Sequence, residues 1–378
     1  MRILHLADLH LGKIFHDVHL TNDQAYLLDQ AATLAQKEHV DTVVISGDVY
    51  DRSMPPVEAT EVLDDFLSRL ILDLGIRVVL IPGNHDSAER IAFGSRLLRD
   101  RGLHIAADPF ACTLIELADE YGPVTFVPLP YIEPITFRRH LEDTDIPDFT
   151  AAYRHILADV SIDGRTVCIA HCYTAGGEGS ESERPLAIGG TYLVDAAVFA
   201  PFSLTLLGHL HRPQKVTSKV WYAGAPLRYS FSELDHEKVF SIFDIDARGT
   251  ATRTTFPVRP LRELRQVSGT LDDILKAAES DPARGDYLSV TLTDRGALFD
   301  YSAKIRSVYP NVLSIVRQQR EGVGDVVNPG DLRRLTDQEI VSRFFEHVAG
   351  DLNQEEQAVL NDVLDAVNRR NGGDPCAL

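Results

Sequence analysis

The first half of the chain alternates short aliphatic and β-branched runs with stretches whose apolar residues recur at helical spacing. Continuous apolar runs are typical of strands that a sheet buries on both faces. One helical stretch follows Asn22, which we expect to cap it, and another follows Pro55 and Pro56. Strands that alternate with helices predict an α/β core with mainly parallel pairing. The predicted strands are residues 3–6, 42–45, 77–81, 166–170 and 205–207.

The second half of the chain changes to shorter β-like segments, of which 238–245 and 251–258 are the clearest. Pro257 and Pro260 then mark a boundary, because proline interrupts regular structure. We therefore predict a first domain over residues 1–258. Residues 261–325 have the pattern strand, helix, strand, helix, strand, which predicts a small α+β domain, and 322–330 has the composition of a linker.

Two amphipathic helices are expected over residues 334–371. Each begins with a capping box, in which a polar side chain and a glutamate three residues later satisfy the first backbone N–H groups of the helix. Thr336 and Glu339 form the first box, and Asn353 and Glu356 form the second. The apolar faces of these helices either pack on their own domain or dock on a partner helix pair, and the pattern alone does not separate the two.

Composition places the chain among ordinary globular proteins. It has 378 residues, of which 44% are hydrophobic, and a net charge of −19. This acidity argues against binding nucleic acid by bulk electrostatics, although a nuclease that grips phosphate through bound cations remains compatible with it. No apolar stretch approaches the ~20 residues of a membrane helix, and the four cysteines lack paired spacing. We expect a soluble, cytoplasmic protein with reduced thiols.

Polar clusters follow the predicted strands directly. Because the carboxyl ends of parallel strands meet at one edge of an open sheet, clusters that are far apart in sequence are expected to meet there. The Asp8 or Asn84 cluster alone would be typical of a turn, and His209 with His211 alone would be typical of a strand with two exposed histidines. The whole set in this order is typical of neither. The candidate residues are Asp8 and His10, Asp48, Asn84 with His85 and Asp86, His171, and finally His209 and His211.

Asp, Asn and His in this combination are the ligands of Mn²⁺ or Mg²⁺, with Fe and Zn as alternatives. Asp48 lies on a tight glycine turn and is expected to bridge two ions, which would activate water and neutralise phosphate. The His-x-His spacing directs His209 and His211 to the same side of an extended segment. We expect His85 to contact substrate as a proton donor or transition-state stabiliser, with Asp86 orienting its ring. The residues therefore predict a two-metal phosphodiesterase.

These motifs, DLH, GDVYD, GNHD, a lone histidine and GHLH, resemble the signature of the calcineurin-like metallophosphoesterases over about the first 230 residues. The resemblance implies a four-layer core, in which two β-sheets lie between helices, and a dinuclear metal site. It implies that Asp8, His10, Asp48 and His211 hold one ion. It implies that Asp48, Asn84, His171 and His209 hold the other.

The opening MRILHLADLHLGK, the PGNHDS and GHLHRPQ motifs and the stretch WYAGAPLRYSFSE further resemble the SbcD nucleases and their archaeal and eukaryotic counterparts. That family implies Mn²⁺-dependent exonuclease and endonuclease action on DNA, a capping domain, and C-terminal helices that bind an SbcC-type ATPase. It also implies a homodimer, for which the helices at 57–74 and 89–98 are candidates. Arginines near the site (90, 96 and 99) or at the domain boundary (259, 262 and 265) either contact DNA or are solvated.

Two rival functions remain open. A metallophosphoesterase for small phosphodiesters or nucleotides would have the same metal site, because that site reads only phosphate. About a third of the chain lies beyond the catalytic core, which such an enzyme would not need. A non-catalytic scaffold would keep the fold without turnover, but every proposed ligand and His85 are present.

Overall fold

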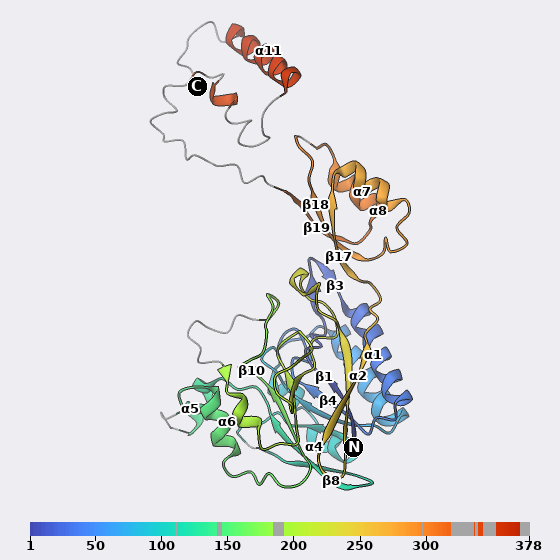
Figure 1. Ribbon diagram of the computed structural model, residues 1–378, viewed down its shortest axis with the longest axis vertical. Coiled ribbons are helices and arrows are strands. Elements are labelled where there is room, and N and C mark those ends of the chain that lie inside the picture. The colour runs from blue at the N-terminus through green and yellow to red at the C-terminus, as the bar shows by residue number, and fades with distance from the viewer. Residues whose placement is uncertain are drawn as a thin grey trace. The chain divides into compact units, whose positions relative to one another are not determined.

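The computed structural model describes most of the chain, and it divides into two compact units, residues 1–264 and 265–378 (Figure 1). The described residues are 1–110, 112–141, 146–183, 193–296, 298–318, 336, 339–342 and 353–370. No helix among them is long and apolar enough to cross a membrane.

The first sheet of unit 1 has six strands in the order β16-β15-β1-β4-β5-β6. Strands β1, β4, β5 and β6 pair in parallel with their neighbours. Strands β15 and β16 extend the sheet beside β1 with antiparallel pairing. The bounds are β1 Arg2–Leu6, β4 Thr42–Ser46, β5 Arg77–Ile81, β6 Leu103–Ile105, β15 Val239–Ile245 and β16 Ala251–Pro257.

The second sheet of unit 1 also has six strands, in the order β13-β14-β12-β9-β8-β7. Its four central strands are parallel, and both edge strands are antiparallel to their neighbours. The bounds are β7 Ile115–Asp119, β8 Gly122–Leu129, β9 Thr166–His171, β12 Leu204–Gly208, β13 Gln214–Lys215 and β14 Val220–Tyr222. The predicted strands of both sheets are confirmed.

The two sheets pack face to face with helices on both outer sides (Figure 1). Between the sheets lies a core that includes Ile3, Val44, Val167 and Leu206. A second core joins the first sheet to α1 (Thr21–Lys37), α2 (Val57–Ser68) and the π-helix η1 (Arg69–Asp73). A third core joins the second sheet to α6 (Phe149–Leu157) and η3 (Ala196–Phe199). Helix α5 (Pro134–Leu141) contacts α6. The expected four-layer α/β fold is confirmed.

Two local predictions are wrong. The N-cap of α1 is Leu20, so Asn22 lies inside the first turn and caps nothing. The helix expected at 89–98 is instead two short helices, α3 (Ala88–Ile91) and α4 (Ser95–Leu98), followed by η2 (Arg99–Arg101). Gly94, the N-cap of α4, has a φ of 73°, a left-handed conformation through which one continuous helix cannot run.

The remaining elements of unit 1 are short and lie in loops. They are β2 Ile14–Phe15, β3 Val18–His19, β10 Tyr173–Thr174, β11 Leu193–Val194 and η4 Phe231–Glu233.

Unit 2 contains a three-stranded sheet in the order β17-β18-β19 with two helices packed on it. The elements are β17 Leu264–Gly269, α7 Leu271–Ala278, β18 Tyr287–Leu292, α8 Tyr301–Val308 and β19 Val312–Arg317. This is the strand and helix order that the sequence predicts for 261–325.

The C-terminal region has one complete described helix, α11 (Gln354–Arg370). Both predicted capping boxes are confirmed. The Glu339 carboxylate accepts from the Thr336 backbone N–H at 2.7 Å, and the Glu356 carboxylate accepts from that of Asn353 at 2.9 Å. The predicted linker at 322–330, and the first terminal helix apart from 336 and 339–342, lie outside the described residues.

Candidate metal centre

The candidate residues meet where five strands end. Asp8 and Asp48 follow β1 and β4 of the first sheet, whereas His171 and His209 belong to the ends of β9 and β12 of the second. The prediction of a single sheet edge is therefore wrong, because the site lies where the ends of two packed sheets meet. Backbone hydrogen bonds join the loop after β1 to the loop after β4. One of them runs from the N–H of Asp8 to the carbonyl oxygen of Gly47 at 3.1 Å.

Asp48 lies at the centre of the cluster. Its Oδ2 is 3.4 Å from His171 Nε2, 3.8 Å from His10 Nε2 and 4.0 Å from His85 Nε2. Gly47 before it has a φ of 87°, and a Cβ there would lie 2.3 Å from His171 Nδ1. Only glycine allows the loop to pass so close to the ring.

Several residues of the site have a positive φ that residues other than glycine rarely adopt. The values are 53° at Asp8, 45° at His10, 48° at Asp48 and 105° at His209. Such conformations cost of order 1–3 kcal/mol each and persist where surrounding structure imposes them. Their concentration here indicates a site shaped for function.

Asp8, His10 and His211 form a first buried group of possible metal ligands. The two Nε2 atoms of His10 and His211 lie 3.1 Å apart. Asp8 Oδ1 accepts from the His209 backbone N–H at 2.8 Å. Asp8 Oδ2 is buried and has no hydrogen-bond partner among the described residues. An orphaned buried carboxylate oxygen beside two facing imidazole nitrogens fits a bound cation.

Asp48, His171 and His209 form a second buried group, and Asn84 adds an amide oxygen. His171 Nδ1 lies 2.8 Å from the carbonyl oxygen of Ser46, so Nδ1 donates and Nε2 is left as the possible ligand atom. Asn84 Oδ1 lies 3.0 Å from His171 Nε2 and 3.1 Å from His209 Nδ1. The side chains of Asp48, Asn84, His171 and His209 thus direct possible metal-ligand atoms toward one point.

Burial and close charges shift the pKa values of these groups. Burial raises the pKa of Asp8 to about 7. Burial lowers the pKa of His209 to about 3. Burial opposes the charge on His171, but the Asp48 carboxylate overcomes it and raises the pKa of His171 to about 9. Carboxylates buried this deeply need positive charge beside them, which a cation supplies.

Sequence comparisons identify the family. A model of the calcineurin-like phosphoesterases matches residues 1–213, and one described as the type 5 capsule protein repressor C-terminal domain matches 260–349. The SbcD subunit of the nuclease SbcCD from Staphylococcus epidermidis (strain ATCC 12228 / FDA PCI 1200) is 32% identical over 384 residues. The alignment covers 98% of this chain and 100% of that protein. The chain belongs to the SbcD family of calcineurin-like phosphoesterases. The resemblance stated from the motifs is confirmed.

Two solved structures are also similar. The protein TT1561 of Thermus thermophilus is 17% identical with a TM-score of 0.41. A dimetal phosphatase from Danio rerio is 15% identical with a TM-score of 0.38. Each comparison covers 68% of this chain and 99% of the other.

In this SbcD-family chain, His85 lies at the rim of the centre, but Asp86 does not hold its ring. His85 Nδ1 lies 2.8 Å from the carbonyl oxygen of Asp51. The Asp86 carboxylate accepts from three backbone N–H groups, those of Val49 at 3.0 Å, Tyr50 at 2.9 Å and Gly83 at 2.9 Å. The prediction that Asp86 orients the ring is wrong. It instead joins the two loops that carry Asp48 and His85.

Sequence reasoning also missed the residues that shape the loop of Asp8 and His10. Gln24, buried in α1, donates from Nε2 to the carbonyl oxygens of Leu9 at 3.1 Å and His10 at 2.7 Å. Its Oε1 accepts from the Gly12 N–H at 3.0 Å. Tyr229 donates to the same Leu9 carbonyl at 2.5 Å. Tyr229 lies in the stretch WYAGAPLRYSFSE, which was the only sequence signal for it.

Two of the three candidate arginines at the domain boundary form ion pairs within the chain. Arg262 lies 2.7 Å from Asp23, and Arg265 lies 2.9 Å from Asp281 and 2.8 Å from Asp286. Both guanidinium groups are therefore paired with carboxylates of the chain itself, an arrangement that neither alternative had named.

Proposed function

We propose that this chain is a Mn²⁺-dependent DNA exonuclease and endonuclease, the nuclease subunit of an ATP-dependent complex with an SbcC-type ATPase in DNA repair and recombination. One observation carries the proposal. The predicted ligands converge around Asp48 in a chain that aligns along its length with an SbcD nuclease subunit. Mg²⁺ is the alternative metal.

The donor set supports two cation positions that share Asp48. One cation would be held by Asp8, His10, Asp48 and His211. The other would be held by Asp48, Asn84, His171 and His209. When bound, such a pair activates water and neutralises charge on the phosphate and the leaving oxygen.

His85 is the candidate group for contact with substrate. Its Nδ1 is held by the Asp51 carbonyl, which leaves Nε2 directed at the centre, 4.0 Å from Asp48 Oδ2. The Asp48 Oδ1 accepts from the His85 backbone N–H at 2.9 Å and fixes the residue beside the bridge. In our proposal, His85 protonates the leaving oxygen or stabilises the transition state, and Asp86 supports it by holding its loop.

The alternative function, hydrolysis of small phosphodiesters, is separated by substrate. The protein would be given linear duplex DNA and bis-p-nitrophenyl phosphate, each with Mn²⁺. Efficient cleavage of DNA supports a nuclease. Hydrolysis of the small ester alone, with DNA untouched both with and without the ATPase, would favour the alternative.

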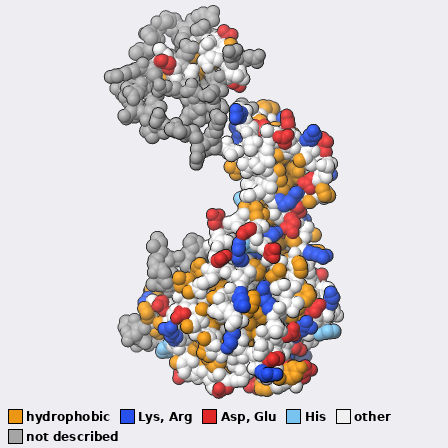
Figure 2. All heavy atoms as spheres, viewed as in Figure 1, with side chains coloured by type: hydrophobic (Ala, Val, Ile, Leu, Met, Phe, Trp, Pro, Cys, Tyr) orange, Lys and Arg blue, Asp and Glu red, His pale blue; other side chains and the backbone are white. Residues whose placement is uncertain are grey.

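The acidity of the chain supports a role for a partner in holding DNA. The whole chain has a net charge of −19. On the face of unit 1 that Figure 2 shows, basic, acidic and hydrophobic side chains are interspersed. Such a mixture provides no broad positive field for a polyanion. The partner ATPase is therefore proposed to supply much of the DNA-binding surface. The described cysteines are free thiols, which is consistent with a cytoplasmic location.

The C-terminal helices are proposed to bind that ATPase. On α11, Val359 is 64% exposed and Val363 is 53% exposed, four residues apart on one face. Exposed valines at this spacing suit docking on a partner helix pair. Val359→Asp with Val363→Asp is expected to abolish co-purification with a co-expressed SbcC-type ATPase, whereas Asp362→Ser, an exposed position on the same helix, is expected to leave it intact. Unchanged co-purification of the valine variant would refute this interface.

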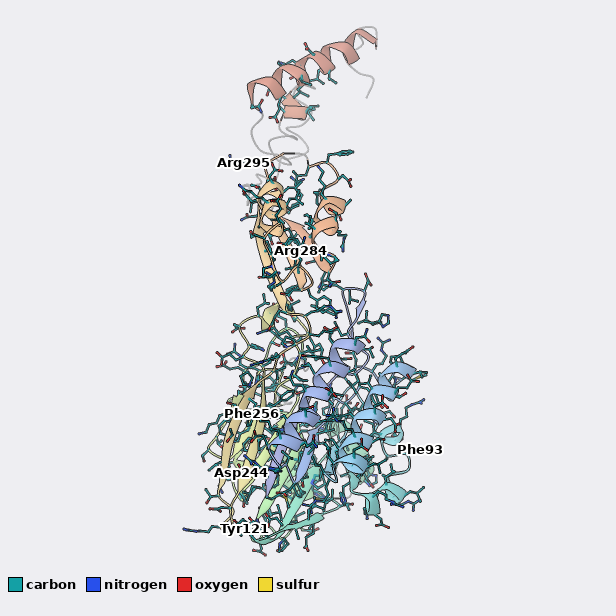
Figure 3. All side chains as sticks on the ribbon, turned by 90° about the vertical axis from the view of Figure 1, so that its right-hand side faces the viewer. Phe93, Tyr121, Asp244, Phe256, Arg284 and Arg295 are labelled. Atoms are coloured by element: carbon teal, nitrogen blue, oxygen red, sulfur yellow. The ribbon has the colours of Figure 1, made fainter. Side chains whose placement is uncertain are left out.

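A homodimer is proposed through the surface around α2, α3 and α4. Phe93 is 87% exposed, Leu97 83% and Leu72 71%, and Phe93 lies at the edge of unit 1 in Figure 3. Beside them is an apolar groove of about 640 Å³ whose lining includes Leu67 and Ile91. Exposed apolar patches of this kind mark interaction sites. By light scattering, Phe93→Asp should be a monomer, and Phe299→Asp, equally exposed at 87%, should remain a dimer. A wild-type monomer would overturn this part of the proposal.

A further inference from the structure

A buried ion pair lies directly behind His211. Glu233, at the end of η4, is fully buried, and the Lys238 side chain is 5% exposed. Glu233 Oε1 lies 3.0 Å from His211 Nδ1, and its Oε2 lies 2.5 Å from Lys238 Nζ. A buried carboxylate is costly unless it is paired, and both oxygens of Glu233 have partners, since Oε1 also accepts from the Tyr229 backbone N–H at 3.3 Å. Neither residue belongs to the proposed ligand set.

The Glu233 contact fixes the tautomer of His211. An ionised carboxylate oxygen only accepts hydrogen bonds, so Nδ1 at 3.0 Å must carry the hydrogen. Ser182 Oγ also lies 2.9 Å from Nδ1, and its own hydroxyl has Ser180 Oγ at 2.6 Å to donate to. Both neighbours of Nδ1 are therefore compatible with a donating Nδ1–H. The lone pair of the ring is then on Nε2, the atom that lies 3.1 Å from His10 Nε2 in the centre.

The backbone of His211 is held by the same cluster. Lys238 Nζ donates to the His211 carbonyl oxygen at 2.9 Å, so this one amine joins the carboxylate to the ligand residue. On the other side, Glu183 Oε1 accepts from the His211 backbone N–H at 2.8 Å. The Glu233 and Lys238 pair thus constrains both where the residue lies and how its ring is turned.

We propose that Glu233 is a positioning residue for the centre: it holds His211 with Nε2 toward the cation of the Asp8, His10 and His211 group, and Lys238 holds Glu233 in place. The inference rests on the proposed two-metal function and names a determinant of one of its two positions. A carboxylate behind a ligand histidine also makes the ligand nitrogen more basic, and its loss lowers metal affinity by roughly 10–100-fold. The effect should be confined to one cation, because the other group is held by Ser46 and Asn84.

Mn²⁺ titration calorimetry of the full chain tests the proposal without any assay of turnover. Wild-type protein is expected to bind two ions. Glu233→Gln is nearly the same shape but carries no charge, and it is expected to bind one of the two ions about 10–100-fold more weakly. Glu237→Gln makes the same chemical change at an exposed position in the same segment and should match wild type.

The outcome that overturns the proposal is wild-type affinity for both ions in Glu233→Gln, or an equal loss for both, which would indicate general loosening. Thermal unfolding without metal establishes that each variant folds. If Glu233→Gln does not fold because Lys238 is left as an unpaired buried charge, Glu233→Gln with Lys238→Met replaces it and is judged by the same criterion. Wild-type protein that binds no Mn²⁺ would instead refute the proposed function, so the two failures are distinguishable.

Discussion

At Gly208 the second sheet packs tightly against the first, and adding one methyl group there should disable the site. Gly208 ends β12, and a Cβ at this position would lie 2.0 Å from the backbone oxygen of Ser46 and 2.9 Å from His171 Nδ1. Its φ is not in the left-handed region, so the obstacle is space alone. Contacts between carbon and a carbonyl oxygen normally exceed about 3.3 Å, so the strands must separate by about 1 Å.

That separation should affect both stability and turnover of Gly208→Ala. Overpacking of this kind costs about 1–3 kcal/mol of the free energy of unfolding. The displaced Ser46 carbonyl is also the acceptor that holds His171 Nδ1 at 2.8 Å. Because a displacement of about 1 Å at a reacting centre can cost 100-fold in rate, Mn²⁺-dependent hydrolysis should fall by about that factor.

Urea unfolding and initial rates with bis-p-nitrophenyl phosphate would measure the two effects. Gly285→Ala is the matched control, because a Cβ there meets nothing within 4 Å. It should leave the rate unchanged and stabilise the protein by up to about 1 kcal/mol, through lower entropy of the unfolded chain. Wild-type stability and rate in Gly208→Ala would refute the packing argument.

Three further predictions concern single side chains. Asp86→Asn should lower the free energy of unfolding by about 2–3 kcal/mol in urea titrations, because the new amide N–H₂ must face a backbone N–H group. An unchanged urea midpoint would contradict the conclusion that Asp86 joins the two loops. Two hydrogen bonds from Arg165, at 2.6 and 2.8 Å, hold the pKa of Asp119 well below its usual value near 3.8. The ionised Asp119 therefore stabilises the folded protein above about pH 4, and this contribution is lost as the pH falls. The difference in unfolding free energy between wild type and Asp119→Asn should therefore shrink below pH 4. A difference that does not change with pH would contradict stabilisation by the pair of Asp119 and Arg165. His85→Gln should slow DNA cleavage by about 10²–10⁴-fold but affect the nitrophenyl ester less, since nitrophenolate needs no proton to leave; equal losses would argue against proton donation.

The sequence was informative where structure is local. Apolar runs predicted both sets of central strands, because a strand buried on both faces has few polar positions. The capping boxes at Thr336 and Asn353 were equally readable, since each is formed within four residues. The motifs predicted which residues gather, because each lies at the end of a strand.

Other features depend on partners that are distant in the chain. Gln24 and Tyr229 bond each other at 3.2 Å across 205 positions, and only the folded chain brings them to the same loop. Asp86 appeared to serve its neighbour His85, yet its oxygens bond residues up to 37 positions away. The prediction that all clusters meet at the edge of a single sheet was wrong for the same reason, because hydrophobic periodicity does not indicate which strands share a sheet.

Cleavage of end-labelled duplex and single-stranded DNA with Mn²⁺, Mg²⁺ or EDTA, by wild type and by Asp48→Asn, tests the central claim most directly. Asp246→Asn, at an exposed turn, is the control. The account predicts Mn²⁺-dependent cleavage by wild type and Asp246→Asn that is lost with EDTA and in Asp48→Asn, because Asp48 is the carboxylate that both cation positions share. Cleavage that survives in Asp48→Asn or in EDTA would contradict it.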